Sequence, residues 1–266
     1  MKYYVINLIR ILNSFWTSSI AMEMEYRFNL IIEILSVFGN LTGGLFTLSL
    51  FYNMESDLGG WSWESSIIVL GVYTLLEGFT ITFLQPNLSR IVRHVQNGTL
   101  DFVLLKPIDS QLWVSFRIFS PWGIPSIIAG LVLILSGLYL LNIQITFTMI
   151  LRSISMLISS LIILYSLWYL IATTSIWFVR VWNANEVLRS TLVAGKYPVN
   201  SYPDPIRTIF TFVIPIAFLT TVPAESMLSI SSNSYILTSI LISSLFFLLT
   251  KMFWNYALRF YTSASS

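Results

Sequence analysis

The sequence predicts an all-α polytopic membrane protein with six transmembrane helices and one amphipathic helix before them. Two observations carry this prediction. Hydrophobic residues make up 56% of the 266 residues and charged residues only 10%, too few for the surface of a water-soluble domain of this size. The apolar residues also gather into stretches of about 20, the length that a helix needs to cross a bilayer. The prediction is therefore one transmembrane domain over residues 1–266.

Six apolar stretches are bounded by polar or charged residues. The predicted spans cover residues 30–51, 65–84, 121–141, 154–178, 208–222 and 235–253. The fifth is short and contains Pro215, which a membrane helix tolerates when neighbours satisfy the freed carbonyl. We expect Pro223 to end it, and residues 223–234 to form a short excursion outside the cytoplasm.

The stretch before the first span, about residues 5–27, has polar and apolar residues on opposite sides of a helix. The polar positions are Asn7, Arg10, Ser14 and Thr17, and the apolar ones are Leu8, Ile11, Leu12 and Phe15. This pattern favours a helix in the cytoplasmic interface. An ordinary helix packed on the protein's own surface is the alternative. The first sixteen residues lack the apolar core and small-residue cleavage site of a removable signal peptide.

Lysine and arginine next to the span ends predict the orientation. With both termini in the cytoplasm, only Arg152 lies outside. The cations then inside are Lys2, Arg10, Arg27, Arg90, Arg93, Lys106, Arg117, Arg180, Arg189, Lys196, Arg207, Lys251 and Arg259. This orientation places residues 85–112 and 180–207 in two cytoplasmic loops.

Several kinds of site are not indicated. The chain has no cysteine and one histidine, His94, so no metal site is predicted. Gly195-Lys196 is followed by Tyr197, and Ser190 stands where a phosphate-binding loop needs its first glycine. The chain is therefore not predicted to hydrolyse ATP. A net charge of +2 without a basic run gives no indication of nucleic-acid binding.

The loop after the second span has the pattern of two short helices. Leu88, Ile91, Val92 and Val95 form an apolar stripe at helical spacing, with Arg90 and Arg93 facing away from it. Asn97-Gly98 is a typical helix stop. A second helix would begin at Thr99 or Leu100, with Asp101 near its start, and end before Lys106-Pro107.

The string "SRIVRHVQNGTLDFVLLKP" resembles the cytoplasmic loop of ABC-2 type transporter permeases, particularly a less characterised bacterial branch with a GTLDxxLLKP-like motif. The order of elements is similar to that family as well. The resemblance implies a permease subunit of an ATP-driven exporter in the bacterial plasma membrane, paired with a second permease that is either the same chain or a homologue. ATP and Mg²⁺ would be bound by a separate ATPase subunit, and no cofactor by this chain.

The resemblance also implies that this loop contains a coupling helix that docks into a cleft of the ATPase. The coupling residues would be Leu88, Arg90, Ile91, Arg93, His94, Val95, Gly98, Thr99, Asp101 and Leu104. We expect the apolar face to enter the cleft and the cations to pair at its rim. A surface connector without a partner is the alternative interpretation.

Glu77 lies deep in the second predicted span, where an ionised carboxylate is costly. We expect it to face protein or a polar cavity, either as part of the transport route or gate or as a structural hydrogen-bonding group. Glu33 is expected near the cytoplasmic interface, in contact with Arg27 or a loop cation. Gly39 and Gly43 fit a small-residue pattern for helix packing.

Two other classes of function compete with an ABC permease. A secondary transporter or channel subunit would need no ATPase, and it would be favoured by paired intramembrane charges or by broken helices in repeated halves. A membrane-embedded enzyme would need convergent His, Asp, Glu or Ser groups at one depth. The sequence shows neither pattern clearly, and it does not identify the substrate.

Overall fold

The structure is a computed structural model that describes residues 2–25, 27–54, 58–178, 182–228 and 233–262. These residues form helices and contain no β-strand. Five helical segments are long and apolar enough to cross a membrane. They are Phe28–Met54, Trp63–Gln96, Pro121–Leu140, Phe147–Ile176 and Ser234–Phe260. The predicted all-α polytopic class is therefore confirmed.

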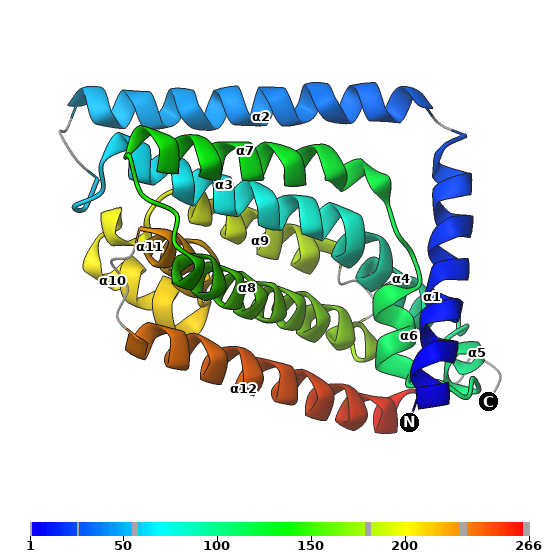
Figure 1. Cartoon of the computed structure of the whole chain (residues 1–266). Helices are drawn as coiled ribbons and strands as arrows, with labels where there is room; N and C mark the ends of the chain where they lie inside the picture. Colours follow the sequence, from blue (N-terminus) through cyan, green and yellow to red (C-terminus); the bar gives the residue numbers. More distant parts are fainter. Residues whose placement is uncertain (1, 26, 55–57, 179–181, 229–232, 263–266) are drawn as a thin grey trace.

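The long helices lie side by side in one bundle (Figure 1). The bundle contains α2 (Arg27–Met54), α3 (Trp63–Phe79), α7 (Ile124–Leu140), α8 (Phe147–Thr173) and α12 (Asn233–Ala257). Both chain termini lie at one end of this bundle, which we call the basal end. The opposite end, which carries the turn around Trp61, is the distal end.

The second span does not stop at residue 84 as predicted. A π-helical turn at Thr80–Leu84 joins α3 to α4 (Gln85–Gln96), so that one helical segment runs from Trp63 to Gln96. Such turns insert an extra residue into a helix and are frequent at functional sites. The predicted loop 85–112 therefore begins as the basal extension of a span.

Helix α3 is the most buried of the long helices, and its backbone touches that of α7. A Cβ atom added to Gly130 would lie 2.5 Å from the backbone nitrogen of Leu75 and 2.7 Å from the carbonyl oxygen of Gly71. Small residues allow such close approach in membrane bundles. The packing pattern predicted at Gly39 and Gly43 is wrong for contacts within this chain, because a Cβ there meets nothing within 4 Å.

The outer helices α2 and α12 leave large apolar side chains exposed. These include Phe28, Phe38 and Phe46 on α2 and Leu241, Leu248 and Met252 on α12. In a bilayer such side chains lie against lipid or another membrane subunit at little cost, because neither neighbour is water.

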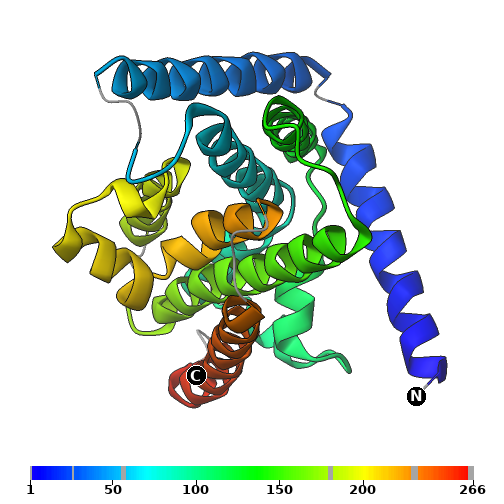
Figure 2. The same ribbon diagram turned by 60° about the vertical axis from the view of Figure 1, so that its left-hand side comes forward.

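Helix α1 (Lys2–Glu23) runs across the spans at the basal end (Figures 1 and 2). Trp16 Nε1 donates to the carbonyl oxygen of Phe116 at 3.0 Å, and Trp122 Nε1 donates to Glu23 Oε2 at 2.5 Å. Phe15 packs edge-on against Trp113 at 4.9 Å between ring centroids. These contacts show that α1 packs on the rest of the protein. Its direction across the spans is also that of a helix lying in the membrane interface.

The fifth predicted span, 208–222, is wrong as a straight crossing. Asp204–Val213 and Ala217–Met227 are bent by 73° at the break around Pro215. Pro223 does not end the helix, because it lies within the continuous helical segment Ala217–Met227, directly after the π-helical turn Ala217–Thr221 that leads into α11 (Val222–Met227). Both halves, α10 (Asp204–Thr208) and α11, lie toward the distal end in Figure 1.

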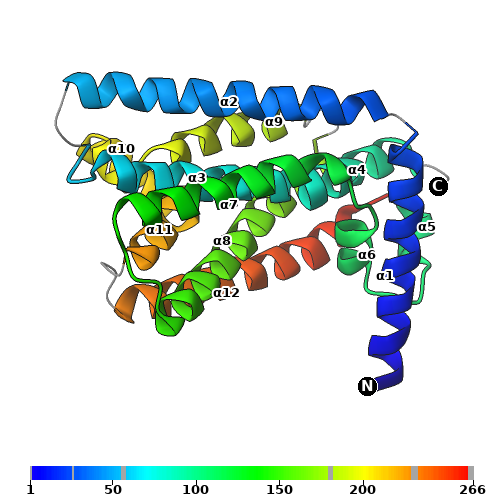
Figure 3. The same ribbon diagram turned by 45° about the horizontal axis from the view of Figure 1, so that its top comes forward.

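A segment other than 208–222 runs from the basal to the distal end of the bundle. The chain leaves α8 through a 3₁₀ turn, Thr174–Ile176, at the basal end, and it enters α12 at the distal end. Between these two points it must run once along the bundle from the basal to the distal end. Helix α9 (Trp182–Leu192) and the 3₁₀ turn Val193–Lys196 do so. Figure 3 shows α9 beside α2 and α3. The described part of the predicted loop 180–207 therefore extends along the bundle to its distal end, and Arg180 lies outside the described residues. The side of the membrane on which this segment lies remains a prediction.

Candidate functional site

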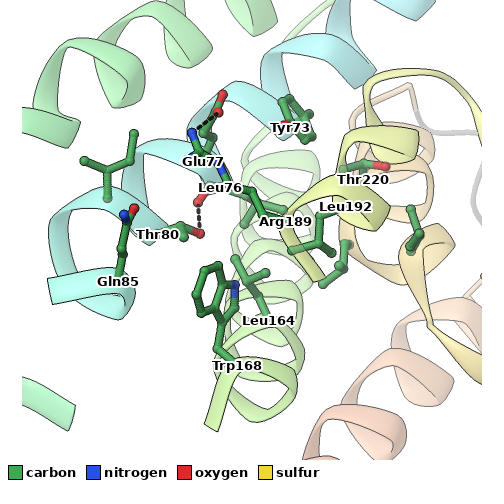
Figure 4. Close-up of a pocket in the computed structure, with 13 residues that line it drawn as sticks. Tyr73, Leu76, Glu77, Thr80, Gln85, Leu164, Trp168, Arg189, Leu192 and Thr220 are labelled. Carbon is green, nitrogen blue, oxygen red and sulfur yellow. Dashed lines mark hydrogen bonds and ion pairs between the residues drawn. The ribbon is translucent and has the colours of Figure 1, made fainter. Parts of the chain in front are cut away.

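Glu77 and Arg189 meet inside the bundle. Glu77 lies near the end of α3, and Arg189 comes from α9, more than a hundred residues later. Arg189 Nη2 lies 3.9 Å from Glu77 Oε1, at the limit of an ion pair, and the two side chains are 49% and 22% exposed. Figure 4 shows both side chains pointing toward one another across a pocket. Each of the two charges thus has an opposite charge close by, which offsets part of the free-energy cost of placing an ionised side chain inside a membrane.

Two further charges complete a cluster that we call the charged quartet: Glu33, Glu77, Arg189 and Lys196. All four line one cavity of about 230 Å³. The other lining residues are Ser36, Val37, Asn40, Leu41, Leu70, Tyr73, Thr74, Ile81 and Ser126. Two acids and two bases give the quartet no net charge when all are ionised. The quartet links α2, α3 and the α9 segment.

The turn that carries Lys196 is fixed by its neighbours. A Cβ on Gly195 would lie 3.1 Å from Thr220 and 3.2 Å from Ile216. The backbone at Gly195 therefore packs closely on the segment that follows Pro215. Lys196 Nζ lies 5.4 Å from the ring centroid of Tyr73, within reach of a cation–π contact. The ammonium group is thereby directed back toward α3.

An apolar crevice adjoins the quartet on the side of α8. It is lined by Leu76, Leu164, Trp168, Leu192, Ile216 and Leu219, and it shares Tyr73, Glu77 and Arg189 with the polar cavity. Trp168 Nε1 and Thr220 Oγ1 line this crevice and have no hydrogen-bond partner among the described residues. The site therefore places a polar compartment next to an apolar one, and the two unpaired donors in the apolar crevice favour a guest that carries a hydrogen-bond acceptor.

Beyond Lys196 the chain reaches the distal turn after the first span. A Cβ on Gly59 would lie 2.6 Å from the carbonyl oxygen of Asn200, so the two backbones are in contact. The backbone N–H of Val199 donates to Thr221 Oγ1 at 3.0 Å. Burial raises the pKa of Tyr202 to about 12, and its hydroxyl donates to the carbonyl oxygen of Ala194 at 3.0 Å. These contacts hold residues 197–202 at the distal end.

The second candidate site is the basal module Gln85–Leu112. Helix α4 ends at Asn97, and Gly98 has a φ of +65°, the left-handed conformation that glycine adopts without strain. His94 Nδ1 hydrogen-bonds Thr99 Oγ1 at 2.8 Å across this turn. The predicted second helix is α5 (Asp101–Leu104), followed by α6 (Ser110–Phe116), which Asp109 caps by accepting from the Leu112 N–H at 3.0 Å.

The apolar stripe of the module faces the chain's own core. Leu88, Ile91, Leu100 and Val103 are at most 2% exposed, and Val95 packs partly buried against the same core. The expectation that this stripe enters a cleft of a partner is therefore wrong for Leu88 and Ile91. A stripe at helical spacing identifies a buried face without saying which molecule covers it.

The outward surface of the module carries a different set of side chains. Arg90 and Arg93 are exposed, as expected, and Leu104 is 37% exposed. Phe102 and Leu105 are 69% and 82% exposed, and sequence reasoning had not singled them out. We call Arg93, Phe102, Leu105 and Lys106 the basal patch. Asp101 lies in the first turn of α5.

Among the residues that the structure describes, no three His, Asp or Glu side chains lie together in a way that could hold a metal ion. The quartet supplies the charged groups that line the cavity and the adjoining crevice among the described residues, and no histidine lines either of them.

A family model described as "ABC-2 family transporter protein" matches residues 38–265. The chain belongs to the ABC-2 transporter family. No curated protein and no solved structure matches it. The family match establishes an ABC transporter permease, a transmembrane subunit of a kind that generally works with an ABC ATPase.

Sequence reasoning singled out Glu77 and Glu33, but it did not identify Arg189 and Lys196 as the cations that line a cavity with them. A usable signal was present, because Arg189 and Lys196 are seven residues apart and so lie on one side of a helix. A carboxylate deep in a membrane protein needs a cation at the same depth. Arg189 and Lys196 could supply it from a helix, because residues 182–196 contain no proline. Glu33 was expected near the cytoplasmic interface, beside Arg27 or a loop cation, and it lines the quartet cavity with Arg189 and Lys196, two cations of the predicted loop 180–207.

Proposed function

We propose that this permease is the transmembrane subunit of an ATP-driven exporter that moves a hydrophobic or amphipathic substrate across the bacterial plasma membrane. The observation that carries the proposal is the family match over residues 38–265. A separate ATPase binds ATP and Mg²⁺, and a second permease, the same chain or a homologue, completes the transport route. The meeting of a polar cavity and an apolar crevice at Glu77 and Arg189 supports an amphipathic substrate.

The basal end faces the cytoplasm in this proposal, with both termini there. The described basal cations are Arg10, Arg90, Arg93, Lys106, Arg117, Lys251 and Arg259. Arg152 and Arg207 lie toward the distal end, and Arg207 is paired with Asp204 at 2.5 Å. The excess of basal cations agrees with the preference of lysine and arginine for the cytoplasmic side.

The ATPase docks on the basal patch. Phe102 and Leu105 supply exposed apolar anchors, and Arg93 and Lys106 supply charge beside them. Buried aromatic and aliphatic anchors carry most of the energy of an interface, whereas charges at its rim mainly affect encounter and orientation. The buried stripe beneath the patch makes the module rigid, so that movement of the ATPase reaches α3 through α4.

Phe102→Asp and Leu105→Asp test this docking. The chain is co-expressed with candidate ABC ATPases from its own genome, and co-purification and ATP hydrolysis are measured. We expect each variant to insert normally and to lose at least about tenfold in ATPase retention, the size expected of one anchor. Ile145→Asp is the matched control, since Ile145 is 54% exposed in the distal turn between α7 and α8. Retention of the ATPase by both variants at the level of the control would contradict the docking site.

One observation favours a second candidate, an ATPase-independent secondary transporter or channel subunit. Paired intramembrane charges and a broken helix are features of such proteins, and the chain has both in the quartet and in the 73° bend. Substrate movement by the purified chain in liposomes without any ATPase would establish this candidate. Strict dependence on the ATPase and on ATP would exclude it.

A further inference from the structure

A large apolar groove lies on the flank of the bundle, away from the charged quartet. Its volume is about 700 Å³, within the range of small-molecule pockets. The lining residues are Trp16, Phe79, Phe83, Leu84, Asp109, Gln111, Leu112, Phe116, Ile158, Leu161, Ile162, Tyr165, Phe247 and Lys251. They come from α1, the α3–α4 segment, α6, α8 and α12.

Along α8 the groove covers about two thirds of the hydrocarbon depth of one bilayer leaflet. On α8 its lining runs from Ile158 to Tyr165, which at 1.5 Å per residue spans about 10 Å. Half of the hydrocarbon core is about 15 Å thick. Because α8 runs from the distal to the basal end, Ile158 marks the deep end of the groove and Tyr165 lies nearer the basal interface. An extended acyl chain of the basal leaflet matches this direction and length.

The polar lining residues gather at the basal mouth of the groove. Asp109 and Gln111 come from the start of α6, and Lys251 comes from the last turns of α12. Trp254 Nε1 donates to Ser110 Oγ at 3.0 Å and holds α12 against the start of α6. The mouth therefore presents one carboxylate and one ammonium group above an apolar slot.

Neither charge at the mouth is used in an ion pair within the described residues, where the pairs are Arg189 with Glu77 and Arg207 with Asp204. Asp109 Oδ1 accepts from the Leu112 N–H, which leaves Oδ2 for another donor. Gln111 Nε2 donates to the Tyr165 hydroxyl at 3.1 Å. Lys106 and Arg117 lie over the ring of Trp113, which does not line the groove.

We propose that this groove binds a phosphatidylethanolamine molecule of the basal leaflet, with one acyl chain in the slot, its phosphate at Lys251 and its ammonium group at Asp109. One cation and one anion complement a zwitterionic headgroup. An anionic phospholipid would place its net negative charge against Asp109. The quaternary ammonium group of phosphatidylcholine has no N–H to donate to the carboxylate. Lysine reaches a headgroup from a helix end by extending along the apolar surface.

Native mass spectrometry of the purified full-length chain tests the proposal. The delipidated protein receives phosphatidylethanolamine, phosphatidylcholine and phosphatidylglycerol of the same acyl composition in equal amounts. We expect phosphatidylethanolamine to be retained at least about fivefold more than either competitor. Asp109→Asn should abolish the preference over phosphatidylcholine, and Lys251→Gln should lower the retention of all three lipids.

Groove-filling variants separate this site from general contact with lipid. Ile158→Trp and Leu161→Trp should each reduce retained phosphatidylethanolamine by about fivefold, whereas Leu241→Trp, on a lipid-exposed part of α12, should leave it unchanged. Equal retention of the three lipids, a preference for phosphatidylglycerol, or full retention by both groove variants would overturn the proposal. Loss of a dimer in the groove variants would instead assign the groove to a second copy of the chain.

Discussion

The basal module Gln85–Leu112 and the crossing segment Trp182–Lys196 both carry two or more cations and a glycine close to a helix end. Their cations have opposite surroundings. Arg90 and Arg93 point outward from the basal end, whereas Arg189 and Lys196 line a cavity inside the bundle with Glu77 and Glu33. The module buries its apolar stripe, while the crossing segment directs Arg189 and Lys196 toward a cavity.

The difference between the two segments follows from what each can pair with. The module has an apolar stripe that packs on the spans, so its arginines are free to stay at the polar interface. The crossing segment has acids available on α2 and α3. A lone charge at the bilayer centre costs about 2.5–3.5 kcal/mol on insertion scales, and an opposite charge at the same depth offsets much of that cost. In this permease, polar and charged residues in a segment therefore do not by themselves show that the segment is a loop.

The largest effect is expected on the buried side of the module. Ile91 is fully buried, so Ile91→Asp places a carboxylate among apolar side chains and should destabilise the protein by at least about 3 kcal/mol. Thermal unfolding of the detergent-purified protein measures the loss. Asn97→Asp, at an exposed position on the same module, should unfold within a degree or two of the parent. Equal stability of the two variants would show that the stripe is not packed on the spans.

A smaller effect is expected from reversing one charge of the quartet. Arg189→Glu leaves three acids facing Lys196, and we expect a loss of about 2 kcal/mol. This figure lies below the 3–5 kcal/mol of a fully buried pair because the Arg189 side chain is half exposed. The double variant Glu77→Arg with Arg189→Glu should recover at least half of the lost stability, again measured by thermal unfolding. An unchanged stability of the single variant would mean that the pair does not form.

The sequence predicted the five long apolar helices because each satisfies the length rule by itself. It also predicted the turn at Asn97-Gly98, because that turn depends on local backbone chemistry. The path of residues 182–196 was missed because the acids that share a cavity with Arg189 and Lys196, Glu33 and Glu77, lie far away in the chain. The broken pair around Pro215 looked like a span because composition alone cannot show a 73° bend.

Within the candidate site, residue types were predictable and their surroundings were not. Glu77 was expected to face protein or a polar cavity, and its side chain lines one. Its role in transport remains a prediction. The position of the two-helix module in the chain was predicted correctly. Its packed face and its outward face were predicted the wrong way round, because helical spacing separates the two faces but does not show what each one contacts. Phe102 and Leu105 stand out only once α5 is placed.

The smallest effect is expected at the turn of the module. Gly98→Ala forces a side chain into a left-handed conformation and should cost about 1 kcal/mol without unfolding the protein. Thermal unfolding should therefore shift by only a few degrees. Gly60→Ala is the matched control in the distal turn, where φ is +85° and a Cβ meets nothing within 4 Å. A loss of ATPase retention in Gly98→Ala but not in Gly60→Ala would assign the turn to coupling as well as to stability.

Cysteine accessibility tests most directly whether residues 182–196 cross the membrane, and the chain has no native cysteine to interfere. Single cysteines are placed at Asn200 beyond the crossing segment and at Leu105 in the module, both of them exposed. Intact cells and inside-out vesicles are treated with a membrane-impermeant maleimide. We expect Asn200→Cys to react only in intact cells and Leu105→Cys only in inside-out vesicles. Reaction of both positions from the same side would contradict the crossing and return residues 180–207 to a cytoplasmic loop.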